Sequence, residues 1–327
     1  MILLATVLVI GASVQQRPAP KDTLRLYAVG DINLGRGFAK RQIVKGDTLY
    51  SFRLLRDTLR GADIAFGNLE SPIAPAQAAD SPEVFRAPAA AARALAKAGF
   101  DIVSTANNHA WDAGQGGVEE TMLQLASAGV RFVGSGKGRD VARQPVVVKR
   151  HGWRVAFFAV TRAWNPAPYT FARHAGADWV AWGDTAWVGP AIRALKRRGG
   201  ADLVVVSVHG GHEYVDEPPD YHSALLRGLV DVGADLVLGH HPHVLQPVVW
   251  YKGKPIVQSL GNFVFSQTDP WTRLSAVLRV RVAPDKSMRL SAIPVRAGYQ
   301  PRLATGPAAD SIESRLGIPL STDSTGQ

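Results

Sequence analysis

The sequence predicts an α/β layered fold with mixed sheets, built as one domain. Over the first two-thirds of the chain, short apolar runs typical of buried strands alternate with segments of helical spacing. The C-terminal third instead contains pairs of strands joined by tight turns, which adds hairpins to the sheets. No segment with the composition of a linker interrupts residues 23–302, so we expect a single domain there, followed by a C-terminal tail over residues 303–327.

The expected elements follow from apolar runs and periodicity. The strands of the alternating part cover residues 24–29, 64–66, 102–105, 131–133, 203–208 and 236–238. The helices cover residues 51–60, 88–97, 117–128, 187–198 and 221–232. Pro88 suits the first turn of a helix, and Gly99 and Gly129 suit the ends of two others. Hairpins are expected at residues 146–160, 248–260 and 274–295, and the tail after Pro301 is expected to be peripheral, with a short helix near residues 312–316.

Residues 1–22 resemble a secretory signal followed by a linker. Residues 2–14 are almost entirely apolar or small, and residues 15–22 are polar and contain proline. No Lys or Arg precedes the apolar run, no A-x-A site follows it, and it is shorter than the ~20 residues of a spanning helix. We expect export to the periplasm or the outer face of the cytoplasmic membrane. An uncleaved membrane anchor is the second alternative, and a first strand of the domain is the third.

The chain is basic, with 37 Lys and Arg against 27 Asp and Glu and a formal net charge of +10. Such a surface favours anionic partners such as phosphorylated molecules, acidic polymers or lipid head groups. Because the basic residues are spread out, a basic surface without a particular partner is an equal alternative. No nucleic-acid-binding motif accompanies the charge, so nucleic acid is not expected as a partner. The absence of cysteine excludes disulfides and thiolate metal sites.

Polar motifs follow five of the predicted strands. In chain order they are Asp31, Asn68 with Glu70, Asn108 with His109, His209, and His241 with His243. A lone Asp after glycine is usually a turn residue, and a lone buried histidine is usually structural. Ligands of open α/β sheets, however, bind at the carboxyl ends of the strands. Five motifs in that position therefore predict one functional rim.

The segment Gly239-His240-His241-Pro242-His243 is the strongest of these motifs. In an extended segment, side chains two residues apart point the same way, so His241 and His243 are expected to converge on one point. Six of the nine histidines lie in three short segments behind apolar runs. A set of imidazole, carboxylate and amide ligands without sulfur suits one or two divalent ions such as Mn, Fe or Zn better than Ca²⁺. Two such ions bridged by a carboxylate can clamp a phosphoryl group and activate a water.

The motifs are similar to those of the CapA/PgsA family of capsule synthesis proteins (poly-γ-glutamate capsule proteins), a branch of the calcineurin-like metallophosphoesterase fold. The matching stretches run in the family's order and cover residues 30–36, 68–73, 107–114, 209–214, 239–246 and 259–263. As a set they are specific, although the single tetrapeptides are not. The resemblance implies a four-layer α/β/β/α metallophosphoesterase-like sandwich with a dinuclear metal site.

The resemblance also implies a role for each site residue. Asp31 and His243 would bind the first metal, Glu70 would bridge, and Asn108, His209 and His241 would bind the second. His109 would act on the phosphoryl oxygens or the leaving group, and Asp112 would hold its tautomer. Four further residues are expected to support the site or contact substrate: Asn68, His212, Glu213 and Asn262. The alternative is that they cap tight loops. His240 is expected to be a structural neighbour.

Departures from the family pattern bear on the expected chemistry. Asn33, another expected supporting or substrate-contacting group, replaces the histidine of the usual Asp-x-His motif. Glu70 stands where an Asp usually bridges the metals, and Gly210 stands where the family often has Trp. The loss of an imidazole would weaken the first metal site, so the fold could persist with one metal or with none.

Two functions fit these observations. The first is an exported, metal-dependent hydrolase of phosphoesterase type, acting on a phosphorylated substrate or a related bond in a capsule, poly-γ-glutamate or other cell-envelope polymer. The second is a non-catalytic accessory protein that binds and passes an anionic capsule polymer, together with a capsule synthase complex in the membrane. The set of ligand residues favours the first function, whereas the family name favours the biological setting of the second.

Overall fold

The computed structural model describes residues 22–75, 84–163, 165, 179–183, 185–265, 267 and 269–321. The predicted signal or anchor over residues 1–22 lies outside these ranges except for its last residue. No helix within the described ranges has both the length and the apolar character needed to cross a membrane.

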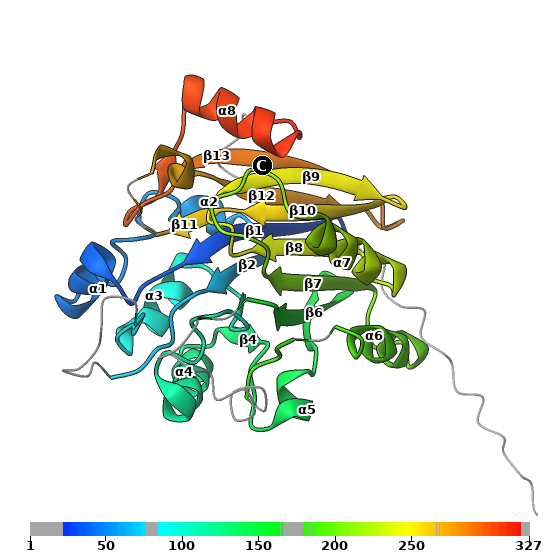
Figure 1. The fold of residues 1–327 in the computed structure, drawn as a ribbon, viewed down its shortest axis with the longest axis horizontal. Coiled ribbons are helices and arrows are strands. Elements are labelled where there is room, and N and C mark those ends of the chain that lie inside the picture. Colours follow the sequence, from blue (N-terminus) through cyan, green and yellow to red (C-terminus); the bar gives the residue numbers. More distant parts are fainter. Residues whose placement is uncertain are drawn as a thin grey trace, which may run out of the picture.

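The first sheet has eight strands in the order β14-β13-β12-β1-β2-β3-β4, with β11 paired to β1 (Figure 1). Strands β1 to β4 are parallel to one another, and β12 and β13 join the sheet as antiparallel strands. The strands are β1 (Leu24–Ile32), β2 (Ile64–Leu69), β3 (Ile102–Ser104), β4 (Arg131–Val133), β11 (Asn262–Val264), β12 (Leu274–Val282), β13 (Met288–Arg296) and β14 (Arg302–Leu303).

The second sheet has six strands in the order β5-β6-β7-β8-β10-β9. Strands β6, β7, β8 and β10 are parallel, whereas β5 and β9 are antiparallel edge strands. The strands are β5 (Val146–Arg150), β6 (Trp153–Thr161), β7 (Leu203–His209), β8 (Leu236–His240), β9 (Leu245–Tyr251) and β10 (Lys254–Leu260). The prediction of mixed sheets is confirmed.

Three apolar clusters show that the two sheets and the helices form four layers. Successive residues of β1, such as Leu26 and Tyr27, belong to different clusters, because successive side chains of a strand point to opposite faces. The cluster between the sheets includes Phe66 of β2 and Phe157 of β6, whose rings stack at 5.6 Å. Such a pair contributes about 0.5–1.5 kcal/mol beyond burial. The predicted four-layer α/β/β/α sandwich is confirmed.

Helices cover the outer faces of both sheets (Figure 1). On the first sheet they are α1 (Gly37–Val44), α2 (Arg56–Arg60), α3 (Ala90–Ala98) and α4 (Gly114–Ser127), and on the second they are α6 (Val188–Arg197) and α7 (Asp220–Asp231). The helix expected over residues 51–60 begins only at Arg56. The amides of Phe52 and Leu55 bond to carbonyls three residues earlier, which makes this stretch a series of turns. The short elements α1, α5 (Arg139–Ala142), β11 and β14 were not predicted.

The helix expected near residues 312–316 is present as α8 (Pro307–Leu316). Its residues Ile312 and Leu316 are fully buried in the cluster between the sheets. The amide of Ser321 then bonds to the carbonyl of Ala292 in β13. The prediction of a peripheral tail is therefore wrong for residues 307–321, because the apolar face of α8 closes part of the core.

Asp63 connects the two sheets at the amino ends of their parallel strands. Its carboxylate accepts hydrogen bonds from the backbone amide of Arg25 at 2.7 Å and from Nη2 of Arg25 at 2.8 Å. Nε2 of His151, in the turn between β5 and β6, lies 3.2 Å from the same carboxylate. Burial alone would raise the pKa of Asp63, but the bonds to Arg25 hold the pKa below its usual value.

We expect Asp63→Asn to lower the free energy of unfolding by about 1 kcal/mol at pH 7. A carboxyl whose pKa is lower in the folded state stabilises the protein above its unfolded pKa and loses that effect as the pH falls through the folded pKa. The difference between variant and wild type should therefore shrink below about pH 4. Urea denaturation across this pH range measures it, with exposed Asp57 as the matched control through Asp57→Asn. A difference that does not change with pH would contradict the assignment.

Candidate metal centre

The candidate site lies where the carboxyl ends of the parallel strands of both sheets meet. Asp31 and Asn68 are the next-to-last residues of β1 and β2 in the first sheet, and His209 is the last residue of β7 in the second. Nδ2 of Asn68 lies 2.9 Å from Oδ1 of Asp31 and 3.1 Å from Nδ1 of His209. The Asn68 amide therefore joins the two sheets at the rim.

Two groups of buried side chains have the spacing of metal ligands. Glu70, His209 and His241 form one group, and Asp31, Glu70 and His243 form the other. Within each group the donor atoms all lie within 4.8 Å of one another. Glu70 belongs to both groups, and its Oε1 lies 3.7 Å from Nε2 of His209 and 3.8 Å from Nε2 of His243. This geometry suits a carboxylate shared by two ions.

The carboxylate of Glu70 shows that a cation fits this site. Glu70 is fully buried, and neither of its oxygens has a hydrogen-bond partner among the described residues. Burial raises the pKa of Glu70 well above its usual range, and the nearby charge of Asp31 adds to that effect. An unpaired buried carboxylate is costly, whereas carboxylate and imidazole donors readily hold a divalent ion. One or two divalent ions would satisfy these oxygens.

His209 and His241, the two histidines of the first group, are held in the neutral form that binds metals. Burial lowers the pKa of His209 well below its usual range. Burial also lowers the pKa of His241 to about 3, with a contribution from His243. Both rings are therefore neutral at physiological pH, as metal ligation requires. Oδ1 of Asn108 lies 2.8 Å from Nε2 of His209, so the predicted amide ligand stands beside this group.

Asp31 and His243 form the charged part of the site. Burial alone would raise the pKa of Asp31, but His240 and His243 hold it well below its usual range. For the imidazole of His243 the effect of burial is opposite, since burial alone would lower its pKa, but the bond to Asp31 raises that pKa. Nδ1 of His243 also lies 2.9 Å from Oδ1 of Asn262, which leaves Nε2 directed toward Glu70. Asn262 thus fixes the ring orientation of a predicted ligand.

The backbone of the His241-Pro242-His243 segment is not extended. His241 has φ 98° and His243 has φ 59°, so both lie in the left-handed region that most residues avoid. The expectation that alternation along a strand brings the two rings together is therefore wrong. The rings, with centroids 6.1 Å apart, are brought near each other by a turn. Left-handed residues of this kind cost about 1–3 kcal/mol each and are concentrated at functional sites.

His109, beside the two ligand groups, is held by Asp112 and Phe85. Its Nδ1 lies 2.7 Å from Oδ2 of Asp112, which also accepts a bond from the amide of Phe85 at 2.8 Å. The Phe85 ring stacks on His109 with centroids 3.8 Å apart. Oδ1 of Asn165 accepts a bond from Nδ2 of Asn108 at 2.8 Å, and Nδ2 of Asn165 lies 3.4 Å from Nδ1 of His109. Sequence reasoning missed Phe85 and Asn165, since both lie in loops without a recognisable motif.

The remaining predicted residues occupy different positions around the site. Asn33 is buried, and its Oδ1 accepts a bond from the amide of Gly35 at 3.0 Å, so this oxygen caps its own turn. His240 is fully buried, with Nδ1 3.4 Å from Oδ1 of Asp31. Exposed His212 lies near Tyr221 of α7, with ring centroids 5.8 Å apart. His212 is thus the one predicted residue that the described contacts direct toward a helix rather than toward the ligands.

Glu213 and Tyr214 lie at the mouth of the site. Glu213 is exposed, yet its negative charge raises the pKa values of both Glu70 and His243. Burial raises the pKa of Tyr214 to about 12, and Glu213 reinforces that effect. The Tyr214 hydroxyl accepts a bond from Nε2 of Gln267 at 2.8 Å. Gln267, another residue missed in the sequence, thereby borders the site.

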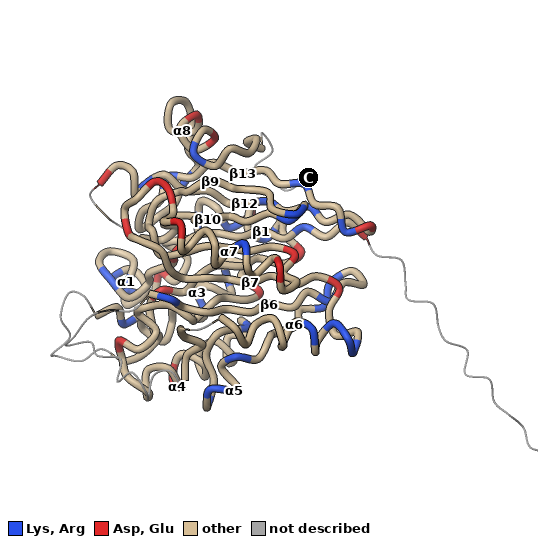
Figure 2. The backbone as a smooth tube through the Cα atoms, turned by 45° about the vertical axis from the view of Figure 1, so that its right-hand side comes forward, with Lys and Arg blue, Asp and Glu red and all other residues tan. Residues whose placement is uncertain are grey.

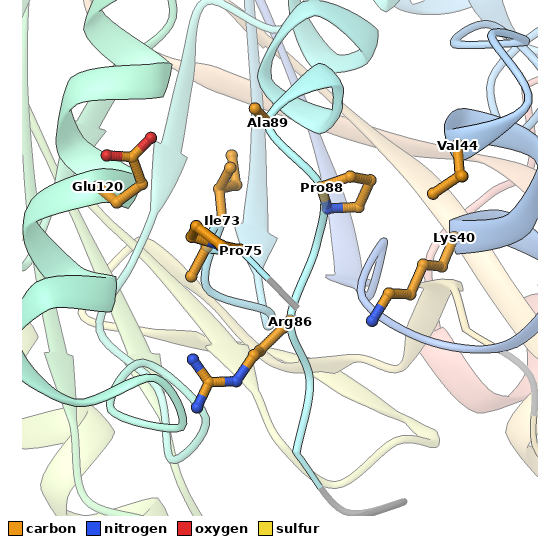
Figure 3. Close-up of a pocket in the computed structure, with 9 residues that line it drawn as sticks. Lys40, Val44, Ile73, Pro75, Arg86, Pro88, Ala89 and Glu120 are labelled. Atoms are coloured by element: carbon orange, nitrogen blue, oxygen red, sulfur yellow. The ribbon is translucent and has the colours of Figure 1, made fainter. Parts of the chain in front are cut away.

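A separate cavity of about 230 Å³ lies between α1, the start of α3 and α4 (Figure 3). Lys40 and Glu120 stand on its opposite sides, and Ile73 and Pro88 contribute to its walls. None of the predicted ligands lines this cavity. Arg86 connects it to the candidate site, because Nη2 of Arg86 donates to the backbone carbonyl of Asp112.

Comparison with known proteins identifies the family. Residues 25–267 match the family described as "Bacterial capsule synthesis protein PGA_cap". The chain is 31% identical over 306 residues to the capsule biosynthesis protein CapA of Bacillus anthracis, covering 90% of this chain and 74% of CapA. It is 32% identical over 279 residues to the PGA biosynthesis protein CapA of Bacillus subtilis, covering 84% and 72%. The chain therefore belongs to the bacterial capsule synthesis protein (PGA_cap) family.

Two solved structures from Thermus thermophilus are similar in part. One is a hypothetical protein, with 18% identity and a TM-score of 0.49 over 82% of this chain and 99% of that one. The other is the sulfate thiohydrolase SoxB, with 16% identity and a TM-score of 0.48 over 93% and 61%.

We expect Mn²⁺ or Zn²⁺ to raise the melting temperature of the wild-type protein by about 5 °C or more at saturating concentration. Glu70→Gln should abolish this rise, because it removes the shared donor. In the absence of metal the variant should be no less stable than wild type at pH 8. Burial raises the pKa of the Glu70 carboxyl in the folded state. Such a group destabilises the fold as the pH rises above its unfolded pKa.

Differential scanning calorimetry with and without each metal measures both effects. Glu217→Gln, at an exposed carboxylate, serves as the control and should keep the full rise. A wild-type protein without any metal-dependent shift would argue against the metal centre. A Glu70→Gln variant that keeps the metal-dependent shift would show that Glu70 is not part of the metal centre.

Proposed function

We propose that this protein is a metal-dependent hydrolase of phosphoesterase type, acting in the biosynthesis of an anionic capsule polymer such as poly-γ-glutamate. The observation that supports it most is the pair of ligand groups that share the buried carboxylate of Glu70, whose oxygens have no hydrogen-bond partner among the described residues. The names of the relatives, capsule biosynthesis protein and PGA biosynthesis protein, support the biological setting. In keeping with that setting, we propose that residues 1–22 direct export or anchor the protein outside the cytoplasmic membrane.

Each ion would have its own set of donors. Asp31, Glu70 and His243 would hold one, and Glu70, Asn108, His209 and His241 would hold the other. Divalent ions in such a centre polarise phosphoryl oxygens and lower the pKa of a bound water. Mn, Fe and Zn all suit these donors, since imidazole and carboxylate accept each of them.

The first donor set is the weaker of the two. Asn33 contributes no imidazole, and its oxygen is engaged by the amide of Gly35. The set that contains His209 and His241 has two neutral imidazoles, which bind without releasing a proton. We therefore propose that the two sites differ in affinity and that the set with His209 fills first.

His109 and Asp112 would move the proton in the reaction. The 2.7 Å contact with Asp112 engages Nδ1 of His109 and leaves Nε2 for the substrate. The Phe85 ring stacked at 3.8 Å fixes the plane of the imidazole. His109 can then donate a proton to the leaving oxygen, which is the role of a general acid.

A non-catalytic accessory role is the second candidate. The missing imidazole at Asn33 favours it, because a weakened first site lowers the capacity for two-metal chemistry. Part of the chain is also 34% identical over 173 residues to a protein of Mycobacterium tuberculosis named probable polyglutamine synthesis accessory protein, covering 44% of that protein. In this role the same rim would bind the polymer and pass it to a capsule synthase complex in the membrane.

We expect the purified protein to hydrolyse bis(p-nitrophenyl) phosphate in the presence of Mn²⁺. Asp31→Asn and His241→Ala should each lower kcat/KM by at least about 100-fold. Even mutation of a residue that only hydrogen-bonds to a metal ligand lowers metal affinity or activity about 10–100-fold. His212→Ala, at an exposed histidine of similar sequence context, is the control and should stay within about threefold of wild type. Steady-state kinetics with metal content measured on the same samples checks this. Tight metal binding without any hydrolysis would favour the accessory role.

We expect Asp112→Asn to lower kcat by about 10–100-fold while metal content remains unchanged, because Asp112 orients His109 and does not contact the ligands. A variant with normal kcat would exclude the proposed proton donor. Loss of metal would instead assign Asp112 to the centre itself.

A further inference from the structure

Three arginines line a polar cavity of about 290 Å³ beside the metal centre. Arg273 precedes β12, Arg296 ends β13 and Arg302 begins β14. All three are exposed, and no acidic residue is among the described residues that line the cavity. In the ranges described above, none of the three guanidinium groups forms an ion pair with a carboxylate. We refer to this cavity as the arginine pocket.

Strand pairing fixes the three arginines close together. Arg296 lies directly opposite Arg302 in the β13–β14 ladder. The amide of Ala297 donates to the carbonyl of Arg273 at 2.9 Å, which places Arg273 next to Arg296 across the β12–β13 pair. Like charges directly opposite each other destabilise a sheet, and an anion between them would relieve that repulsion.

Opposed arginines alone do not mark a site in this protein. Arg281 also faces Arg289, at the other end of the β12–β13 ladder, and it faces Arg25 in the β1–β12 ladder. Figure 2 further shows Lys and Arg scattered over most elements of the chain. The arginine pocket differs because a third arginine and a cavity accompany the facing pair. Among these three facing pairs, it is also the one that adjoins the metal centre.

Gln267 and Phe265 form the wall between the arginine pocket and the metal centre. The backbone carbonyl of Gln267 accepts a bond from Nε of Arg273, and its Oε1 accepts one from Nδ2 of Asn262 at 2.9 Å. Asn262 in turn holds His243. The Phe265 ring lies 4.8 Å from that of His243, measured between centroids. Among the described residues, Gln267 and Phe265 contact both regions, so a chain-like ligand that reaches from the metal centre to the arginines would pass these side chains.

We propose that the arginine pocket binds carboxylate groups of the anionic polymer while another part of the same polymer lies at the metal centre. Guanidinium groups bind carboxylates through two parallel hydrogen bonds, and a polymer with repeated carboxylates can engage several arginines at once. The identity of the polymer rests on the proposed function. The location of an oxyanion subsite does not, because it follows from the arginines and the cavity.

Binding of a fluorescently labelled poly-γ-glutamate oligomer to the full chain tests the proposal by anisotropy. Arg296→Gln combined with Arg302→Gln should weaken binding at least about tenfold at constant ionic strength. Arg281→Gln combined with Arg289→Gln removes the same charge from the same sheet and should change binding less than about twofold. Equal losses in both double variants would mean non-specific attraction by the basic surface. No loss in either would also overturn the proposal.

Competition and hydrolysis separate the remaining possibilities. Inorganic phosphate should displace the oligomer only weakly. Full displacement at concentrations equal in carboxylate and phosphate would identify a phosphate subsite and overturn the assignment to carboxylates. Hydrolysis of bis(p-nitrophenyl) phosphate by the Arg296→Gln, Arg302→Gln variant should match wild type, because this small substrate does not reach the arginine pocket. If neither the wild-type protein nor the variant hydrolyses this substrate, the proposed hydrolase function is wrong. The binding comparison still tests whether the arginine pocket binds carboxylates.

Discussion

The buried carboxylate of Glu70, which has no hydrogen-bond partner among the described residues, is the constraint on which the rest of the site depends. It lies fully buried where the two sheets meet, and its pKa is raised by burial and by Asp31. Apolar packing alone gives no reason to place a carboxylate there, because an unpaired one lowers stability. The cost is understandable if the carboxylate binds cations, with His209 on one side and His243 on the other at nearly equal distances.

The fold supplies the two sides of this arrangement through its strand directions. Parallel strands of the first sheet deliver Asp31, Asn68 and Glu70, whereas parallel strands of the second deliver His209 and the histidines after β8. The antiparallel strands have a different role. β12, β13 and β14 extend the first sheet to one side and carry the arginines of the arginine pocket. Gln267 connects the two regions, since it bonds to both Arg273 and Asn262.

The sequence predicted the layers and the rim because both depend on local patterns. Buried strands such as β7 are uninterrupted apolar runs, and a polar residue at the end of each run marks the rim. The route by which His241 and His243 approach each other was predicted wrongly, because positive φ at a non-glycine residue leaves no trace in hydrophobic periodicity. The burial of α8 was missed because its apolar face is narrow, with Ala308, Ile312 and Leu316 as its buried residues.

Loop residues were the least predictable part of the site. Phe85 and Asn165 reach His109 and Asn108 through tertiary packing, and neither belongs to a strand end or a motif. The arginines of the pocket were visible only as part of a dispersed positive charge. Their convergence required the register of three strands, including the two-residue β14, which no sequence pattern indicated.

Anomalous diffraction from crystals grown with Mn²⁺ tests the central claim most directly. We expect two peaks at the rim on either side of the Glu70 carboxylate, the stronger one beside His209 and His241 and the weaker one beside Asp31 and His243. A rim without any peak, together with an ordered Glu70 carboxylate in the same buried position, would contradict the account. So would manganese bound only at sites away from Glu70.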